Sequence, residues 1–227
     1  MNDDESILRR RLPESAWKFA AGVGTDFPMD VGARFDLEMP FRIRLSTTFG
    51  FMPKPYAATI NGFLEGVGVY DDNVGNLIEA TLQSSFVWRT HVGWRPFAAH
   101  GFYVDAGYGL VTLGGSTTSS ELVSAATGQT FPSSEGNRTH DFNANLTLHM
   151  VDAELGWLFT LLPHWQLRVA LGRAFTVGSS TSITPQFQVR SPAATAAFEQ
   201  YAESFLNDEV RSYAMTPVVS VGTAYVF

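Results

Sequence analysis

The 227-residue sequence contains no cysteine, which excludes disulfide scaffolds, thiolate metal sites and cysteine nucleophiles. Only 16% of the residues are charged, and acids exceed bases by 22 to 15. The resulting net charge of -7 disfavours a protein that binds nucleic acid. No uninterrupted apolar run approaches the ~20 residues that a transmembrane helix needs, which argues against a helical membrane protein.

The first 14 residues open with acidic side chains and lack the apolar segment of a signal peptide. We therefore expect either a cytosolic chain or an exported chain whose signal has been removed and replaced by a start methionine. The length suits a single large domain. We interpret residues 1–14 as a tail and residues 15–227 as one domain.

The dominant pattern is strict alternation of apolar with small or polar residues, which is typical of β-strands with two unlike faces. In the clearest stretch, Phe35 and Leu37 alternate with Arg34, Asp36 and Glu38. The alternating segments lie at residues 17–24, 29–39, 41–51, 86–94, 102–110, 151–159, 165–172 and about 213–227. The sequence therefore predicts an all-β fold with an even number of strands.

A soluble β-sandwich also alternates, but three features favour a membrane-spanning barrel. The apolar face carries uniformly large side chains, whereas the opposite face mixes glycine, alanine and serine with charges. Short connections also alternate strictly with long ones, at about 53–82, 114–140 and 178–211. Finally, aromatic residues mark the short-turn end of almost every strand, as in a membrane girdle: Trp17, Phe41, Trp94, Phe102, Trp157, Trp165, Tyr225 and Phe227.

With these features, the chain resembles the small eight-stranded outer-membrane barrels of Gram-negative bacteria, of the OmpA, OmpX and OmpW kind. The final strand, with Val219, Val221, Thr223, Tyr225 and Phe227 in alternation, resembles the signal by which such barrels are assembled. The resemblance implies an antiparallel up-and-down transmembrane β-barrel with short periplasmic turns and long, partly helical extracellular loops.

The resemblance also implies an outer-membrane location for a mature chain without its signal peptide, with residues 1–14 as a periplasmic tail. The implied partners are membrane lipids, lipopolysaccharide and the assembly machinery, which would recognise the strand ending in Phe227. Neither the subfamily nor the oligomeric state follows from the sequence.

An eight-stranded barrel is just wide enough for side chains to fill it, so inward charges must be paired or hydrated. Turns centred on Pro40 and near Ala98, together with the hairpin at 161–164, predict the pairs Asp36–Arg44, Glu38–Arg42, His91–Asp105 and Glu154–Arg168. The complete predicted lumen network is Lys18, Arg34, Asp36, Glu38, Arg42, Arg44, Arg89, His91, Asp105, Asp152, Glu154 and Arg168. We interpret this network as a structural plug, with a polar path for protons or small solutes as the alternative.

His91 with Asp105 is the one pair that resembles a catalytic acid–base arrangement. Ser46 and Ser220 also point inward, but nothing in the spacing brings either hydroxyl to His91. The calcium-like stretch at 71–76 has its glycine one position early and is better explained as a turn. We therefore expect no catalytic residues, no metal and no cofactor.

The long loops contain helical patterns that carry the functional hypothesis. Residues 57–82 fit two short amphipathic helices that include Phe63 and Leu64, and residues 191–210 fit one helix with Ser191 as N-cap and Pro192 first. The second helix has one apolar stripe: Phe198, Tyr201, Phe205 and Leu206. This stripe either packs as a cap, or lines a vestibule or partner surface.

We thus predict a non-enzymatic barrel that binds or admits small apolar or amphiphilic molecules through its loops. The alternatives are a lipid-modifying outer-membrane enzyme and a purely structural or adhesive barrel.

Overall fold

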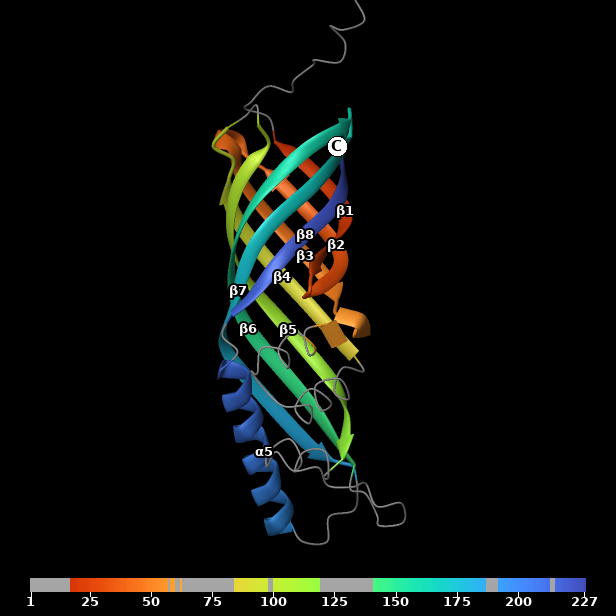
Figure 1. Cartoon of the computed structure of the whole chain (residues 1–227), viewed down its shortest axis with the longest axis vertical. Coiled ribbons are helices and arrows are strands. Elements are labelled where there is room, and N and C mark those ends of the chain that lie inside the picture. The colour runs from red at the N-terminus through yellow and green to blue at the C-terminus, as the bar shows by residue number, and fades with distance from the viewer. Residues whose placement is uncertain are drawn as a thin grey trace, which may run out of the picture.

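The computed structural model describes residues 17–56, 58–59, 62, 84–97, 100–118, 141–186, 192–212 and 215–227. The described elements are eight strands, one 3₁₀ turn and one long helix, shown in Figure 1. Their bounds are β1 Lys18–Phe27, β2 Asp30–Glu38, η1 Pro40–Arg42, β3 Ile43–Phe51, β4 Ser84–Trp94, β5 Phe102–Thr118, β6 Asp141–Leu162, β7 Trp165–Pro185, α5 Pro192–Ser212 and β8 Met215–Val226.

The strands form a closed barrel in which each strand pairs antiparallel with its neighbours in sequence, and β8 closes on β1. The predicted eight-stranded antiparallel barrel is therefore confirmed. The C-terminal residue helps to seal this closure, because the Phe227 N–H donates to the Phe19 carbonyl and the two rings lie 5.5 Å apart. The predicted tail at residues 1–14 lies outside the described residues.

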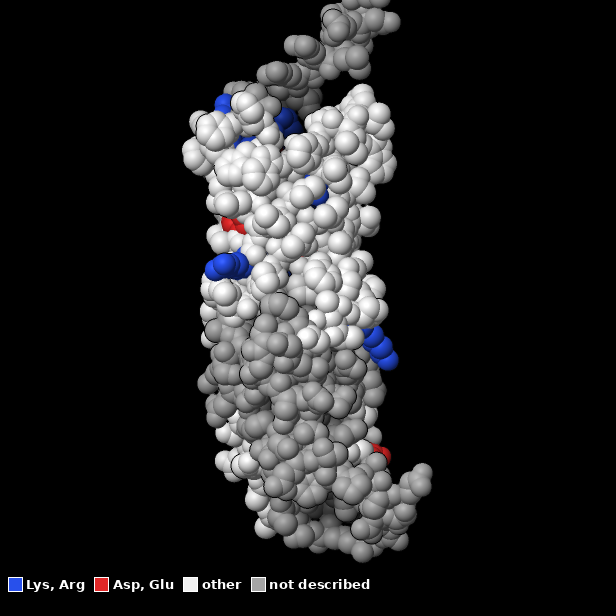
Figure 2. All heavy atoms as spheres, viewed as in Figure 1, with Lys and Arg blue, Asp and Glu red and all other residues white. Residues whose placement is uncertain are grey.

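The faces of the strands are divided as the alternation predicted. Large apolar side chains are exposed on the outside, and the inward positions are buried. Figure 2 shows that the described part of the wall carries few charged side chains on the face in view. Met29 departs from the prediction, which placed it on the outer face. It belongs to the turn between β1 and β2, outside the regular alternation, and its side chain is buried inside the barrel.

Two turns shift the predicted pairing by two residues. The β2–β3 connection contains η1, where Phe41 and Arg42 adopt left-handed φ values of 65° and 64°, so the turn centres on Phe41 instead of Pro40. Glu38 consequently lies opposite Arg44, and Asp36 lies opposite Ser46. The β4–β5 turn is displaced in the same way, so that His91 lies opposite Gly107 and Asp105 lies opposite Gly93.

Strands β5, β6 and β7 extend further towards the loops than predicted. Residues 114–118 and 178–185, predicted as loop, are strand, and so are residues 141–150, to which the prediction assigned no element. Because β8 begins at Met215, opposite Phe175, residues 176–185 of β7 have no described strand partner on that side. Helix α5 runs beside this part of β7, at the lower end of the barrel in Figure 1. Among the described residues, no helix is both long enough and apolar enough to cross a membrane.

Candidate functional site

The centre of the barrel interior is organised around Arg89, which is 1% exposed. Its Nη1 donates to Asp26 Oδ2 at 2.6 Å, and its Nε and Nη2 donate to Asp152 Oδ2 at 3.0 and 2.9 Å. Asp152 also faces His91, whose Nε2 lies 2.7 Å from Asp152 Oδ1. These residues come from β1, β4 and β6, so a single guanidinium ties three parts of the wall together across the lumen.

Arg168 on β7 forms a second centre. Its Nη1 donates to Asp26 Oδ1 at 3.0 Å, and its Nη2 donates to Glu154 Oε2 at 2.6 Å. Its Nε donates to the Tyr103 hydroxyl, which in turn donates to Glu154 Oε1. The predicted Glu154–Arg168 contact is therefore present. Asp26 joins the two arginine centres into one network, because each of its oxygens accepts from a different guanidinium.

The third part of the network lies nearer the short-turn end. Asp36 accepts from Arg34 and from Arg44, each at 3.1 Å. The predicted Asp36–Arg44 pair therefore forms, but diagonally, because of the shifted register. Arg44 also lies 3.6 Å from Asp105 Oδ2, and its guanidinium stacks 3.9 Å above the Tyr103 ring.

At the short-turn end itself, Glu38 accepts from Arg95 at 2.6 Å and lies 3.9 Å from Lys18. The predicted Glu38–Arg42 pair is not among the described contacts, because Arg42 belongs to η1 and not to β3. Its guanidinium donates instead to the Pro96 carbonyl at 2.9 Å, where it links two turns. The mouth of the barrel is thus a separate and more exposed set of charges.

The predicted His91–Asp105 pair does not form, because the register places His91 with Asp152. The structure also brings together two residues that the sequence left apart, since Ser46 lies directly opposite His91 on β3. However, Ser46 Oγ accepts from Arg34 at 2.7 Å, and both Ser46 and His91 are at least 98% buried. The described contacts of Ser46 and His91 are therefore with charged members of the network.

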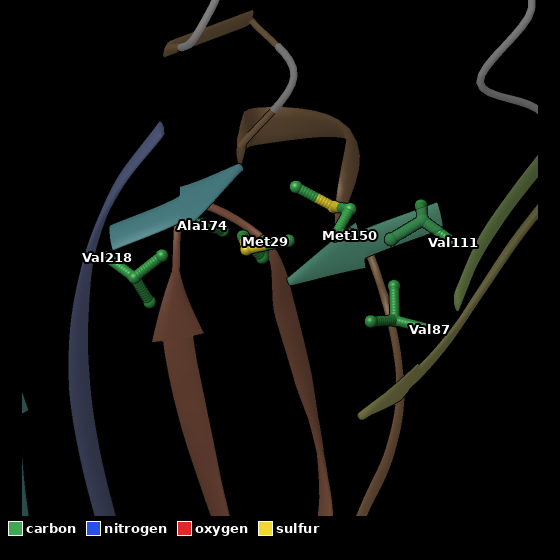
Figure 3. Packing of buried hydrophobic residues seen from close by; sticks show 6 residues of the cluster. All are labelled: Met29, Val87, Val111, Met150, Ala174 and Val218. Atoms are coloured by element: carbon green, nitrogen blue, oxygen red, sulfur yellow. The ribbon is translucent and has the colours of Figure 1, made fainter. Parts of the chain in front are cut away.

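On the loop side of the charges, the interior becomes apolar. Six buried side chains from the wall converge there, as Figure 3 shows. Leu113 and Leu148 pack against them and are partly buried. These six residues form the apolar layer: Met29, Val87, Val111, Met150, Ala174 and Val218. The described interior is therefore divided into a charged half towards the short turns and an apolar half towards the loops.

A cavity of about 50 Å³ remains beside β1, β2 and β8. It is lined by the mouth residues Lys18 and Glu38 at one end and includes Asp26 and Asp30 deeper in the barrel. This volume holds roughly three to five waters, given ~10–15 Å³ for each. The charged half is therefore incompletely filled by side chains. The unfilled space is lined by the acids Asp26, Asp30, Asp36 and Glu38 and by the bases Lys18, Arg34, Arg44 and Arg168.

Three members of the network were not included in the sequence prediction: Asp26, Asp30 and Tyr103. Asp26 keeps the inward phase of Lys18 and Ala20, so extending the first strand by two residues would have identified it. Asp30 and Tyr103 keep the inward phase of Arg34 and Asp105. The contacts of Asp30 with Arg89 and of Tyr103 with Arg168 join strands that are not neighbours, and hairpin geometry alone does not predict them.

The predicted loop helix is present as α5, which begins at Pro192 as expected. It binds the unpaired side of β7: the Ile183 N–H donates to Glu203 Oε1 at 2.9 Å, and Thr181 Oγ1 donates to Asn207 Oδ1 at 3.0 Å. The Phe198 ring lies 5.4 Å from Phe142 of β6. A helix that covers a free strand edge prevents pairing with other chains.

Tyr201, in contrast, is 58% exposed, so the predicted stripe is not buried along its whole length. The side chains of Phe205 and Leu206, the cap residue Ser191, and Phe63 and Leu64 of the predicted 57–82 helices lie outside the described residues.

Replacing Phe198 with serine should loosen α5 and leave the barrel intact. Fully burying a phenylalanine side chain contributes about 1.5–3 kcal/mol. The half-buried Phe198 contributes part of this, and its contribution holds the helix to the sheet instead of holding the barrel closed. We expect faster proteolysis within residues 192–212 and an unchanged unfolding transition of the barrel. Tyr201→Ser on the exposed face is the matched control, and equal proteolysis of the two variants would contradict this packing.

The aromatic residues predicted to form a girdle lie at the short-turn end. Phe102 and Trp157 have ring centroids 5.2 Å apart, and Tyr225 lies 5.8 Å from Trp165 and 5.1 Å from Phe227. Phe41 and Trp94 are well exposed, as is Trp17 just before β1. These rings surround the same end of the barrel that carries the charged mouth.

A comparison with protein families found no matching family, and a comparison with curated proteins found no match. Among solved structures, a major outer membrane protein from Thermus thermophilus is 14% identical, with 93% of this chain and 100% of that chain covered and a TM-score of 0.44. Acinetobacter baumannii CarO2 is 12% identical, with 92% and 98% covered and a TM-score of 0.43. The N-terminal β-barrel domain of Pseudomonas aeruginosa OprF is 8% identical, with 94% and 98% covered and a TM-score of 0.39. Identities this low say nothing about a ligand or an activity.

Proposed function

We propose that the chain is a non-enzymatic β-barrel that spans the outer membrane of a Gram-negative bacterium. The observation that carries this proposal is the inverted distribution of side chains. Val23 and Leu171 are 62% and 59% exposed on the outer wall, whereas Arg89 and Asp105 are each 1% exposed inside. Such a wall would aggregate in water, but it is the surface that hydrocarbon solvates well. A closed barrel also leaves no unpaired backbone edge in the lipid.

The strand lengths support the same proposal. A transmembrane β-strand needs about 9–11 tilted residues, and β1 to β4 have 10, 9, 9 and 11 residues. The aromatic rings at the short-turn end then lie at the periplasmic interface. The opposite ends of β5, β6 and β7 extend beyond this thickness on the extracellular side.

The proposed surroundings follow from this orientation. Membrane lipids contact the apolar wall, and lipopolysaccharide contacts the loop-side extension, whose outward residues include Asn143, Asn145 and Ser182. We further propose that the assembly machinery recognises β8 and its terminal Phe227. Chemistry on a substrate is not part of the proposal, because the described His91 and Ser46 are sealed within the network.

The finer proposal is that small apolar or amphiphilic molecules bind on the loop side of the interior. The apolar layer and the adjoining Leu113 and Leu148 present hydrocarbon surface there. Phe142 and Ile183 continue it along the extended strands towards α5. The charged network lies behind this surface and opposes deeper entry of an alkyl chain, because burying apolar groups against charges leaves those charges without water or partners.

A fatty acid carrying a photoactivatable diazirine tests both levels of this proposal in proteoliposomes. After irradiation, mass spectrometry should find labels on outward residues such as Leu171 and Phe175, and also on Leu113 or Leu148 inside. Leu148→Asn should remove the interior labels and leave the outer ones. Labels confined to the outer wall would contradict amphiphile binding, and an unlabelled outer wall would contradict the membrane-spanning barrel.

A further inference from the structure

The charged half of the barrel contains more acids than bases. Its described arginines are Arg34, Arg44, Arg89 and Arg168, and its described carboxylates are Asp26, Asp30, Asp36, Asp105, Asp152 and Glu154. Four positive charges therefore face six negative charges. Even a protonated His91 beside Asp152 would leave one negative charge in excess. An uncompensated charge in a buried environment is costly, so this half of the lumen needs either a further cation or a proton on one of its carboxylates.

Asp30 is the carboxylate with the weakest compensation. It is 1% exposed, and among the described residues no hydrogen-bond donor reaches either of its carboxylate oxygens. The Arg89 guanidinium lies 3.9 Å away, but its short contacts go to Asp26 and Asp152. Asp105 also lacks a hydrogen-bond donor, yet two arginines lie within 3.9 Å of it, and it is not among the residues that line the cavity.

A second oxygen faces the same space. Thr48 on β3 is 4% exposed, its hydroxyl has no hydrogen-bond partner among the described residues, and it lines the cavity together with Asp30. A carboxylate and a hydroxyl that line one cavity with room for water are oxygen ligands of the type that hard cations accept. The described residues contain no group of three or more histidine, cysteine or acidic side chains placed to hold a metal ion, which disfavours a divalent metal.

The described cavity leads to the two oxygens from the side of the short turns. The cavity runs from the mouth residues Lys18 and Glu38 to Asp30, and the apolar layer lies on the loop side of the network. From these observations we infer that Asp30 and Thr48 bind a small monovalent cation, Na⁺ or K⁺, which enters with part of its hydration shell from the short-turn end. This site goes beyond the proposed function and is independent of any molecule bound at the loops.

The test compares the unfolding midpoint of the detergent-solubilised chain in equal concentrations of sodium, potassium and choline chloride. Choline is too large for the cavity and keeps the ionic strength constant. We expect the midpoint to rise saturably by a few degrees in sodium or potassium relative to choline, because a ligand that binds only the folded state stabilises it. Asp30→Asn should abolish this dependence and should be at least as stable as the wild type in choline.

Asp141→Asn, which changes an exposed carboxylate at the loop-side end of β6, is the matched control and should keep the full cation dependence. Thr48→Val should weaken the dependence, and it provides an independent variant if Asp30→Asn does not fold. Identical midpoints of the wild type in all three salts would overturn the proposal, because Asp30 would then be neutralised without a metal cation. An unchanged dependence in Asp30→Asn would also overturn it by placing the cation elsewhere.

Discussion

Arg89→Met should destabilise the barrel by roughly 3–5 kcal/mol, the range observed when one partner of a buried ion pair is removed. Arg89 compensates Asp26 and Asp152 through three hydrogen bonds of 2.6–3.0 Å. Methionine fills a similar volume but leaves both carboxylates buried without that cation. Denaturant unfolding followed by tryptophan fluorescence measures the loss.

Two further variants identify the cause of this loss. Arg173→Met removes an exposed arginine from the outer face of β7, where its described contact is with the Met215 sulfur at 3.5 Å, and should not destabilise the barrel, because an apolar side chain suits a lipid-facing wall at least as well as a charge. Adding Asp26→Asn and Asp152→Asn to Arg89→Met should recover much of the stability, because the uncompensated charges are then gone. Equal effects of Arg89→Met and Arg173→Met would show that the network does not stabilise the barrel.

Gly156→Ala should cost about 3 kcal/mol, at the upper end of the range for overpacking a filled interior. A Cβ atom at this position would lie 2.2 Å from Tyr103 Cζ and 2.3 Å from its hydroxyl oxygen. The ring has little room to retreat, because its hydroxyl bonds both Arg168 and Glu154 and its face supports Arg44. Displacing Tyr103 therefore disturbs three charged partners together.

The matched control is Gly114→Ala, whose Cβ would meet the Asn145 and Ser84 side-chain oxygens at 3.0 Å, and which should cost much less. The double variant Gly156→Ala/Tyr103→Ala should lose less stability than the sum of the losses in the two single variants, because the added methyl group has space once the ring is removed. Strict additivity of the two changes would contradict the steric contact, and an unaffected Gly156→Ala would contradict the tight packing of this layer.

The strand count and the two faces were predictable because one buried surface and one apolar outer surface impose period two over every short strand. The extended parts of β6 and β7 were not predictable in this way. Met150 pairs with Thr176 of β7 and His149 pairs with Gly178, so Val177 is an extra residue in β7 without a partner in the ladder. Beyond this bulge the buried positions of β7 change from even to odd, from Ala174 to Thr181, and the alternation loses its phase.

The membership of the charged network was largely predictable, but its pairing was only partly so. Inward direction follows from strand phase, whereas the turn centre sets the cross-strand partner, and the left-handed residues Phe41 and Arg42 moved that centre. Contacts across the lumen, such as His91 with Asp152, join strands that are not neighbours. The geometry of these contacts depends on closure of the barrel and on the small residues that leave room for the arginines. The spacing of hairpins in the sequence gives no information on either.

The membrane-spanning barrel is tested most directly by nitroxide accessibility in lipid bilayers. The chain contains no cysteine, so every introduced cysteine gives a unique label. Labels at Val23, Val92 and Leu171 on the outer wall should collide with oxygen dissolved in the lipid and be shielded from a water-soluble nickel complex. Labels at Gln166 and Ala224, which line the cavity, should show little contact with lipid-dissolved oxygen. If the nickel complex reached the outer-wall labels as readily as a label at the exposed Asp141, the apolar wall would face water and the barrel would not span the membrane.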